Sequence, residues 1–191
     1  TNIASLVMFI GYFALLFGLG DAVSSTGMPE VAQALRAGHL GSLGTAAIEI
    51  GPDALAMAAF LAMFVGFAVK VPLVPFHTWL PDAHVEAPTP VSVLLAGVLL
   101  KMGTYALLRF NFTMLPEQAA VLAVPIAAIA VISIIYGALL ALAQQDLKRV
   151  VAYSSVSSMG YVILGLVAYT VYGVGGATFQ MIAHGLISGL M

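Results

Sequence analysis

The 191-residue chain contains no cysteine, and only 7% of its residues are charged. Without cysteine it can form neither disulfides nor thiolate metal sites, and it cannot ligate an iron–sulfur cluster. We therefore expect no cofactor in this chain, and we expect any redox chemistry to belong to partner chains. The formal net charge of −2 comes without a basic block, so nothing indicates nucleic-acid binding or a polybasic lipid anchor.

Apolar residues, in contrast, make up 62% of the chain. Soluble domains carry roughly 25% charged residues, so this composition indicates an integral membrane protein. The apolar runs are long enough to cross a hydrocarbon core of about 30 Å as helices, and the ten-residue alternation of a membrane β-barrel is absent. The predicted fold class is therefore all-α, a polytopic transmembrane helical bundle.

We predict a single transmembrane domain with about six spans, over residues 3–20, 54–79, 90–110, 119–143, 150–169 and 173–191. The connection before the second span is more polar, and either a solvated loop or a short interfacial helix fits it. Basic residues are divided between alternate loops, so the positive-inside rule does not decide the orientation. The chain has no initiator Met and no charged leader, and we expect an internal piece of a longer polytopic protein.

Lys70 lies in a predicted span that two prolines interrupt, Pro72 and Pro75. A proline lacks an N–H and displaces the carbonyl four residues earlier, so we expect a broken helix with the carbonyls of Ala68 and Val71 released around Lys70. Transporters place ion sites at such breaks, where the backbone lines a cavity. The alternative is a packing kink, with Lys70 extending to a lipid headgroup.

Lys101 lies about 16 Å along its predicted span, close to the bilayer midplane. A charge there costs about 2.5–3.5 kcal/mol even on the lenient insertion scales, so an intramembrane lysine indicates a functional site. Gly97, Thr104 and Tyr105 lie one helical turn away and form a small, polar face. We expect Lys101 to face the bundle interior; the alternative is a static ion pair with a carboxylate outside this chain.

The last span carries a line of polar residues, because Gln180, His184 and Ser188 follow at intervals of four and share one helix face. An intramembrane histidine titrates near neutral pH, which suits a proton relay, although a neutral histidine can also serve packing alone. The preceding span carries hydroxyl groups that suit either a hydrated relay or helix packing. These hydroxyl residues are Tyr153, Ser154, Ser157 and Ser158.

Four residues with metal-binding side chains follow the broken span, namely His77, Asp82, His84 and Glu86. The two histidines are seven residues apart and do not match the i, i+4 histidine pair of helical metal sites. A polar loop at the membrane interface is therefore the preferred interpretation, and no metal site is assigned.

Three stretches carry a family resemblance: FAVKVPLVPFHTWLPDAHVEAPTPVSVLLAGVLLKMGTYALLR, YGALLALAQQDLKRVVAYSSVSSMGYV and QMIAHGLISG. They resemble the antiporter-like, proton-translocating membrane subunits shared by respiratory complex I and the multisubunit Na⁺/H⁺ antiporters, with relatives in membrane-bound hydrogenases. FHTWLPDAH and AGVLLKMG are most similar to the M-type, or chain 4, subunits of complex I.

This resemblance implies a fourteen-helix subunit with two inverted five-helix repeats, of which this chain supplies about helices six to eleven. It places Lys70, Lys101 and His184 on the proton pathway. The implied partners are other membrane subunits and a redox arm with flavin and iron–sulfur centres, in an energy-transducing membrane such as the bacterial inner membrane. Ser158 departs from the family pattern, which often has a histidine there. The carboxylate partner of Lys70 and the second broken-helix lysine are expected outside this chain.

The leading hypothesis is a proton-translocating subunit of NADH:quinone oxidoreductase, with energy from electron transfer in partner chains. Burial and a nearby carboxylate act on a lysine's charge in opposite directions, so movement of the carboxylate would load or release a proton. Two alternatives stay open. The chain could belong to a multisubunit Na⁺/H⁺ antiporter, or it could be a non-conducting membrane scaffold.

Overall fold

The computed structural model describes residues 3–13 and 53–190, which fall into two compact units. The first contains residues 3–13, 53–66 and 107–121, and the second contains residues 67–106 and 122–190. Every regular element in these ranges is a helix. The predicted all-α class is thus confirmed for the part of the chain that the structure describes.

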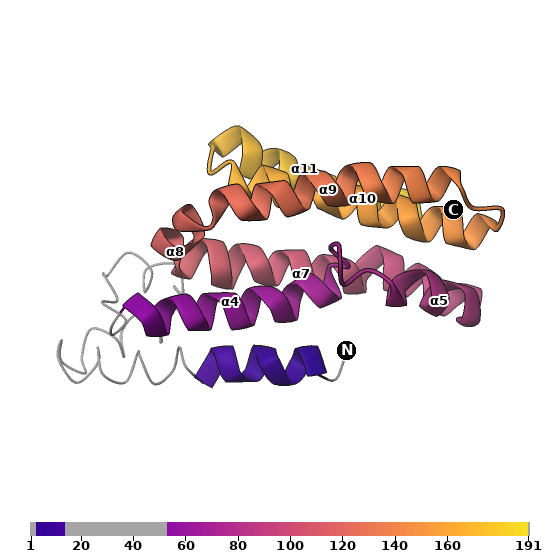
Figure 1. Cartoon of the computed structure of the whole chain (residues 1–191). Coiled ribbons are helices and arrows are strands. Elements are labelled where there is room, and N and C mark those ends of the chain that lie inside the picture. The colour runs from indigo at the N-terminus through magenta and orange to yellow at the C-terminus, as the bar shows by residue number, and fades with distance from the viewer. Residues whose placement is uncertain (1–2, 14–52, 191) are drawn as a thin grey trace, which may run out of the picture. The chain divides into compact units, whose positions relative to one another are not determined.

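The first unit consists of the helix Ile3–Phe13, most of α4 (Asp53–Lys70), η2 (Leu107–Phe112) and α8 (Pro116–Val121). The helix Ile3–Phe13 lies alongside α4 (Figure 1). On α4 the rings of Phe60 and Phe64 stack 6.1 Å apart. The buried amide of Asn111 donates from Nδ2 to the carbonyl oxygen of Phe60 at 3.0 Å, which ties η2 to α4.

The second unit consists of the turn segment 71–78 and the helices α5 (Trp79–Glu86), α6 (Thr89–Leu94), η1 (Leu95–Leu99), α7 (Leu100–Ala106), α9 (Ala123–Leu142), α10 (Leu147–Val167) and α11 (Val171–Leu190). The elements α6, η1 and α7 run on into η2 as one helix, in which η1 and η2 are wider π-helical turns. The helices α9 and α10 pack side by side, and α11 packs on α10 and on η1 (Figure 1).

Polar side chains fix the joints of the second unit. Asp146 caps the start of α10, and its carboxylate accepts the backbone N–H of Lys148 at 3.1 Å. The Ser157 hydroxyl donates to the carbonyl oxygen of Ile134 at 3.0 Å and so joins α10 to α9. The Ser133 hydroxyl of α9 accepts the N–H of Val74 at 3.1 Å, which attaches the turn segment to α9.

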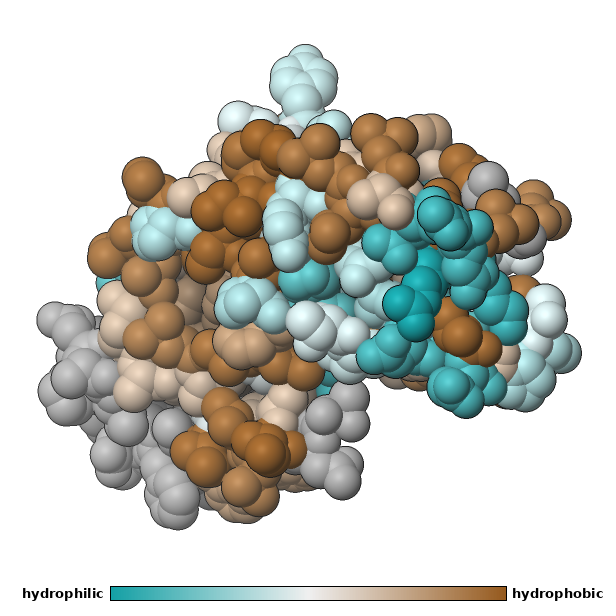
Figure 2. Space-filling model, turned by 45° about the vertical axis from the view of Figure 1, so that its right-hand side comes forward, coloured by the Kyte–Doolittle hydropathy of each residue, from teal (hydrophilic) through white to brown (hydrophobic). Residues whose placement is uncertain are grey.

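Within residues 3–13 and 53–190, three helices are long and apolar enough to cross a membrane, Thr89–Phe112, Ala123–Leu142 and Leu147–Val167. They correspond to the spans predicted at residues 90–110, 119–143 and 150–169. Hydrophobic side chains cover much of the surface that Figure 2 shows. Leu122 interrupts the predicted fourth span, because α8 ends at Val121. The first predicted span is described only as far as Phe13, and the connection before Asp53 lies outside the described residues. The division into six spans stays a prediction.

The α4 helix ends at Lys70, where the two prolines predict a break. The expected release of the Ala68 carbonyl is wrong, because this oxygen accepts the N–H of Leu73 at 3.0 Å. The neighbouring carbonyl of Val69 accepts the indole N–H of Trp79 at 2.8 Å. The turn segment and the first residue of α5 therefore supply new donors to the backbone that the proline disturbs, as the cost of an unpaired carbonyl in an apolar environment requires.

Candidate functional site

Lys101 on α7 and His184 on α11 meet inside the second unit. The Nζ atom of Lys101 lies 2.6 Å from Nδ1 of His184, which is hydrogen-bond distance. His184 is buried, with only 6% of its surface exposed, and Lys101 is half-buried. The structure thus brings together two of the three residues that the sequence placed on a proton pathway.

The helical turn before Lys101 is unusually wide. In η1 (Leu95–Leu99) the N–H of Leu100 donates to the carbonyl oxygen of Leu95, five residues back. Ala96 lies in this turn, and its carbonyl oxygen accepts a hydrogen bond from Nζ of Lys101. Single π-helical turns inside α-helices occur frequently at functional sites. Here the turn carries a backbone oxygen that faces the lysine ammonium.

Neither intramembrane lysine has an acidic partner among the described residues. The one ion pair found there joins Arg149 and Asp82, with 3.8 Å between nitrogen and oxygen. The partners of the Lys101 ammonium are therefore a backbone carbonyl and an imidazole. The carboxylate partner that is expected for Lys70 stays a prediction.

Buried polar groups next to the pair bond to the backbone. The hydroxyl of Thr104, which is fully buried, donates to the carbonyl oxygen of Lys101 at 3.0 Å and lies 2.9 Å from the sulfur of Met181. The hydroxyl of Ser188 donates to the carbonyl oxygen of His184 at 2.5 Å. These bonds fix the two helices and do not extend the chain of side-chain contacts beyond His184.

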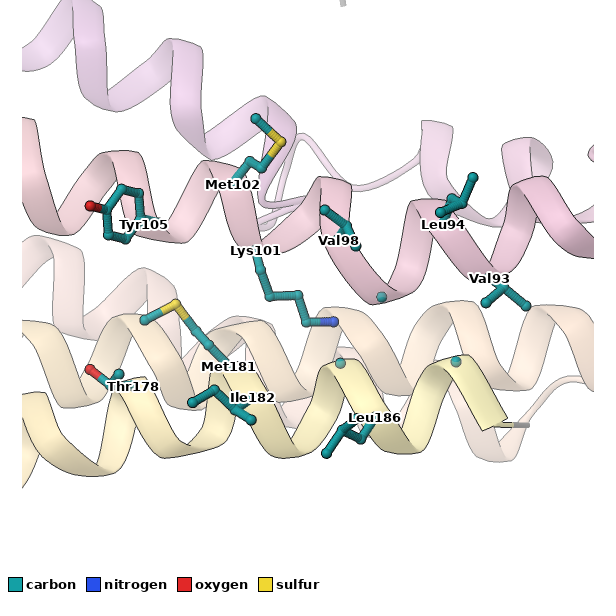
Figure 3. A pocket seen from close by; sticks show the side chains of 13 residues that line it. Val93, Leu94, Val98, Lys101, Met102, Tyr105, Thr178, Met181, Ile182 and Leu186 are labelled. Atoms are coloured by element: carbon teal, nitrogen blue, oxygen red, sulfur yellow. The ribbon is translucent and has the colours of Figure 1, made fainter.

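A groove of about 600 Å³ runs between α6–η1–α7 and α11, and Lys101 is among the residues that line it. Figure 3 shows the Lys101 side chain extending from its helix toward α11 across this groove. The exposed side chains along the groove are mainly apolar, among them Leu94, Val98 and Leu186. Tyr105, which we predicted as a supporting residue, lines the groove and is 57% exposed.

Lys70 lies near α7 with its Cβ atom, at the helical turn that contains Gly103. A Cβ atom placed on Gly103 would lie 3.4 Å from Cβ of Lys70 and 2.8 Å from Cγ2 of Val71. The end of α4 and the first residue of the turn segment therefore pass directly over Gly103, two residues after Lys101. The ammonium of Lys70 itself makes no contact with Lys101 or His184 in the structure.

The predicted hydroxyl relay is not assembled beside Lys101. On α10, Ser154 donates to the carbonyl oxygen of Val151 at 2.8 Å, and Ser157 donates to α9. Ser158 is half-buried, and Gln180 lines a separate cavity on α10 and α11 together with Tyr161. The relay role of these residues and of Tyr153 stays a prediction.

Sequence analysis considered His77 only as a metal ligand and missed its surroundings. His77 is 6% exposed, and its ring packs edge-on against Tyr136, with 5.5 Å between ring centres, and lies 6.3 Å from the ring of Tyr153. Its buried Nδ1 has no hydrogen-bond partner within the described part of the chain. The sequence signal for the burial of His77 was Pro75, two residues earlier, because a proline breaks the helix and redirects the side chains that follow. No group of three metal-binding side chains forms among the described residues.

His84 lies buried on α5, where this short helix meets the start of α10. Its Nε2 has no hydrogen-bond partner among the described residues, while Nζ of Lys148 donates to the carbonyl oxygen of Ala87 at 3.1 Å. Burial first, and then the Lys148 charge, lower the pKa of His84 below its ordinary value of 6.5. The neutral imidazole is therefore the form that this joint favours.

We expect α5 to loosen in mild acid. Because the pKa of His84 is lower in the folded protein, its contribution to stability is complete above about pH 6.5 and is lost as the pH falls through the folded-state pKa. Hydrogen exchange of the α5 amides, corrected for intrinsic rates, should accelerate over this range. His84→Gln should remove the acceleration, whereas an equal pH response in both proteins would contradict the assignment.

Comparison with known proteins places these features in a family. The sequence pattern described as NADH:quinone oxidoreductase/Mrp antiporter, TM, matches residues 1–191. The chain is 44% identical over 192 residues to NAD(P)H-quinone oxidoreductase chain 4 3 of Trichormus variabilis, covering 98% of this chain and 32% of that one. It is 54% identical over 127 residues to NADH-quinone oxidoreductase subunit M of Rickettsia bellii, covering 66% and 26%.

The fold comparison agrees. A chain of respiratory complex I from Thermus thermophilus with bound NADH superimposes with a TM-score of 0.74 at 30% identity, covering 97% of this chain and 38% of that one. This chain thus spans about a third of the length of the relatives it matches. The resemblance carried by the lysine and histidine motifs is confirmed, and the chain belongs to the NADH:quinone oxidoreductase/Mrp antiporter transmembrane family.

Proposed function

We propose that this chain moves protons as the membrane part of an M-type subunit of NADH:quinone oxidoreductase. One observation carries the proposal: an intramembrane lysine and a buried histidine lie 2.6 Å apart, Lys101 Nζ to His184 Nδ1. Both groups are bases, and two positive charges at this distance in a weakly polar environment repel strongly. The pair therefore holds one proton more readily than two, and that proton can reside on either side chain.

The energy for directional movement would come from partner chains. The sequence contains no cysteine, and electron transfer would take place in the redox arm of the complex. A carboxylate that moves toward Lys101 would favour the charged lysine, and its withdrawal would release the proton toward His184. In this scheme Lys70 loads the pathway from the broken end of α4, and water together with the Tyr153, Ser154, Ser157, Ser158 and Gln180 side chains continues it.

A second candidate is the Na⁺/H⁺ antiport that the family description also includes. It would need backbone oxygens free to coordinate a cation near Lys70. Two carbonyls at the end of α4, those of Ala68 and Val69, already accept hydrogen bonds from Leu73 and Trp79. The geometry around the helix break therefore supports proton transfer better than sodium coordination.

A non-conducting scaffold is the third candidate. A scaffold gains nothing from a half-buried ammonium without a carboxylate, because the charge is costly to hold away from water. Hydrophobic replacement of Lys101 would then stabilise the assembled complex with no loss of activity. The His184 contact supports a functional reading instead.

The test uses the whole complex, isolated through a tag on the full-length subunit and reconstituted in sodium-free liposomes. Addition of NADH and a quinone should acidify one side of the membrane, and the acidification should stop when electron transfer is inhibited. A pH gradient that requires Na⁺ and forms without quinone reduction would establish the antiporter instead. Quinone reduction with no pH gradient, in a complex that retains this subunit, would exclude proton movement.

A further inference from the structure

We propose that Gly185 is a positioning residue that sets the distance between Lys101 and His184. Gly185 follows His184 on α11 and faces Gly97, which lies one helical turn before Lys101. The inference rests on the proposed proton transfer and adds to it the element that holds the two groups in register. The residue acts through its lack of a side chain, because it lets one helix backbone approach the other.

A methyl group at this crossing would be in tighter contact than side chains usually make. A Cβ atom on Gly185 would lie 3.1 Å from the carbonyl oxygen of Gly97 and 3.6 Å from Cε of Lys101. The first neighbour is backbone, so it cannot turn away as a side chain can. An alanine here therefore has to displace α11 by a few tenths of an ångström.

Because of a second contact between the same helices, this displacement would change the distance between Lys101 and His184. The hydroxyl of Thr104 lies 2.9 Å from the sulfur of Met181, one turn of α11 before Gly185. The two helices are thus in contact at Met181, which precedes His184, and again at Gly185, which follows it. A side chain added at Gly185 alone would move the two helices apart near His184 and lengthen its 2.6 Å contact with Lys101.

Proton transfer depends steeply on this distance. A misplacement of 1 Å costs about 100-fold in rate where two groups have to meet in a fixed geometry, so a few tenths of an ångström should cost about fourfold. The expected loss is therefore graded and does not require the subunit to unfold.

Other glycines of the same helices provide matched controls. A Cβ on Gly175 or on Gly176, both on α11, would have nothing within 4 Å. A glycine-to-alanine change raises helix propensity by about 1 kcal/mol at every such position. Gly185→Ala differs from Gly175→Ala and Gly176→Ala in the displacement at the crossing.

The experiment measures the rate of proton translocation per assembled complex, over a range of pH, with each full-length variant reconstituted in liposomes. Gly185→Ala should lose about fourfold and change the pH profile of translocation, while Gly175→Ala and Gly176→Ala should match the unmodified complex. A general weakening of packing would lower the amount of complex but would leave the pH profile of each assembled complex unchanged. An unmodified rate and pH profile in Gly185→Ala overturns the inference.

Two further variants distinguish a failure of the role of Gly185 from a failure of the proposed function. If Gly185→Ala does not assemble, Gly189→Val takes its place, because a Cβ placed on Gly189, one turn further along α11, would lie 3.7 Å from Cγ1 of Val93. A reduced rate with an altered pH profile in that variant supports the inference, and unmodified behaviour overturns it. Lys101→Ala serves as the reference: if it translocates protons normally, the proposed function itself fails, whereas its loss together with a normal Gly185→Ala rejects only the role of Gly185.

Discussion

Replacement of Lys101 by arginine is expected to stop proton translocation, with a loss of about 100-fold or more. The guanidinium keeps the positive charge and can still donate to the carbonyl oxygen of Ala96 and to His184. It does not release its proton in the physiological pH range, whereas a lysine ammonium does so when its surroundings change. The variant thus keeps the positive charge at position 101 but can no longer release a proton there. The measurement is the number of protons moved per electron in the reconstituted complex.

The matched control is Lys148→Arg at the start of α10. There Nζ donates to the carbonyl oxygen of Ala87 and joins two elements at the helix end, a role that a guanidinium can fill. Normal stoichiometry in this control, together with normal assembly of Lys101→Arg, isolates proton exchange as the lost property. If Lys101→Arg translocated protons at half the unmodified rate or better, the fixed charge and not its titration would be the contribution of Lys101.

The sequence allowed the spans and the helix break to be predicted, because both depend on local properties. Apolar runs place the helices Ala123–Leu142 and Leu147–Val167 within a few residues, and Pro72 marks the end of α4. The meeting of Lys101 and His184 could not be derived in this way. The two residues are 83 positions apart, and their contact depends on where α11 crosses η1. Family motifs located each residue separately but gave no distance between them.

Errors of the sequence reasoning arose where the backbone can exchange hydrogen-bond partners. Proline was expected to free the carbonyl of Ala68, yet Leu73 reaches it by a bond that skips one residue more than an α-helix does. The same kind of shift makes the π-helical turn that directs the Ala96 carbonyl at Lys101. Apolar periodicity does not report such changes, because the side chains on either side keep nearly the same faces.

Replacement of His184 by asparagine is the second change with a large expected effect. The asparagine amide lies as many bonds from the backbone as Nδ1 of histidine does, so its oxygen can accept from Nζ of Lys101 in the same place. It cannot take up a proton. If His184 receives the proton from Lys101, His184→Asn should lose translocation by about 100-fold, as His184→Ala does, with Lys101 still in its native position.

The comparison of asparagine with alanine distinguishes proton transfer from orientation. Alanine leaves the Lys101 ammonium with the carbonyl of Ala96 as its remaining partner at this site and opens a cavity where the buried imidazole was, so it disturbs the geometry as well as the titration. A histidine that only orients Lys101 would be replaced well by asparagine, and translocation would recover to near the unmodified rate in that variant alone. Equal losses in the two variants, with assembly retained, would instead require that the imidazole itself carries the proton, because the acceptor that asparagine preserves would then be insufficient.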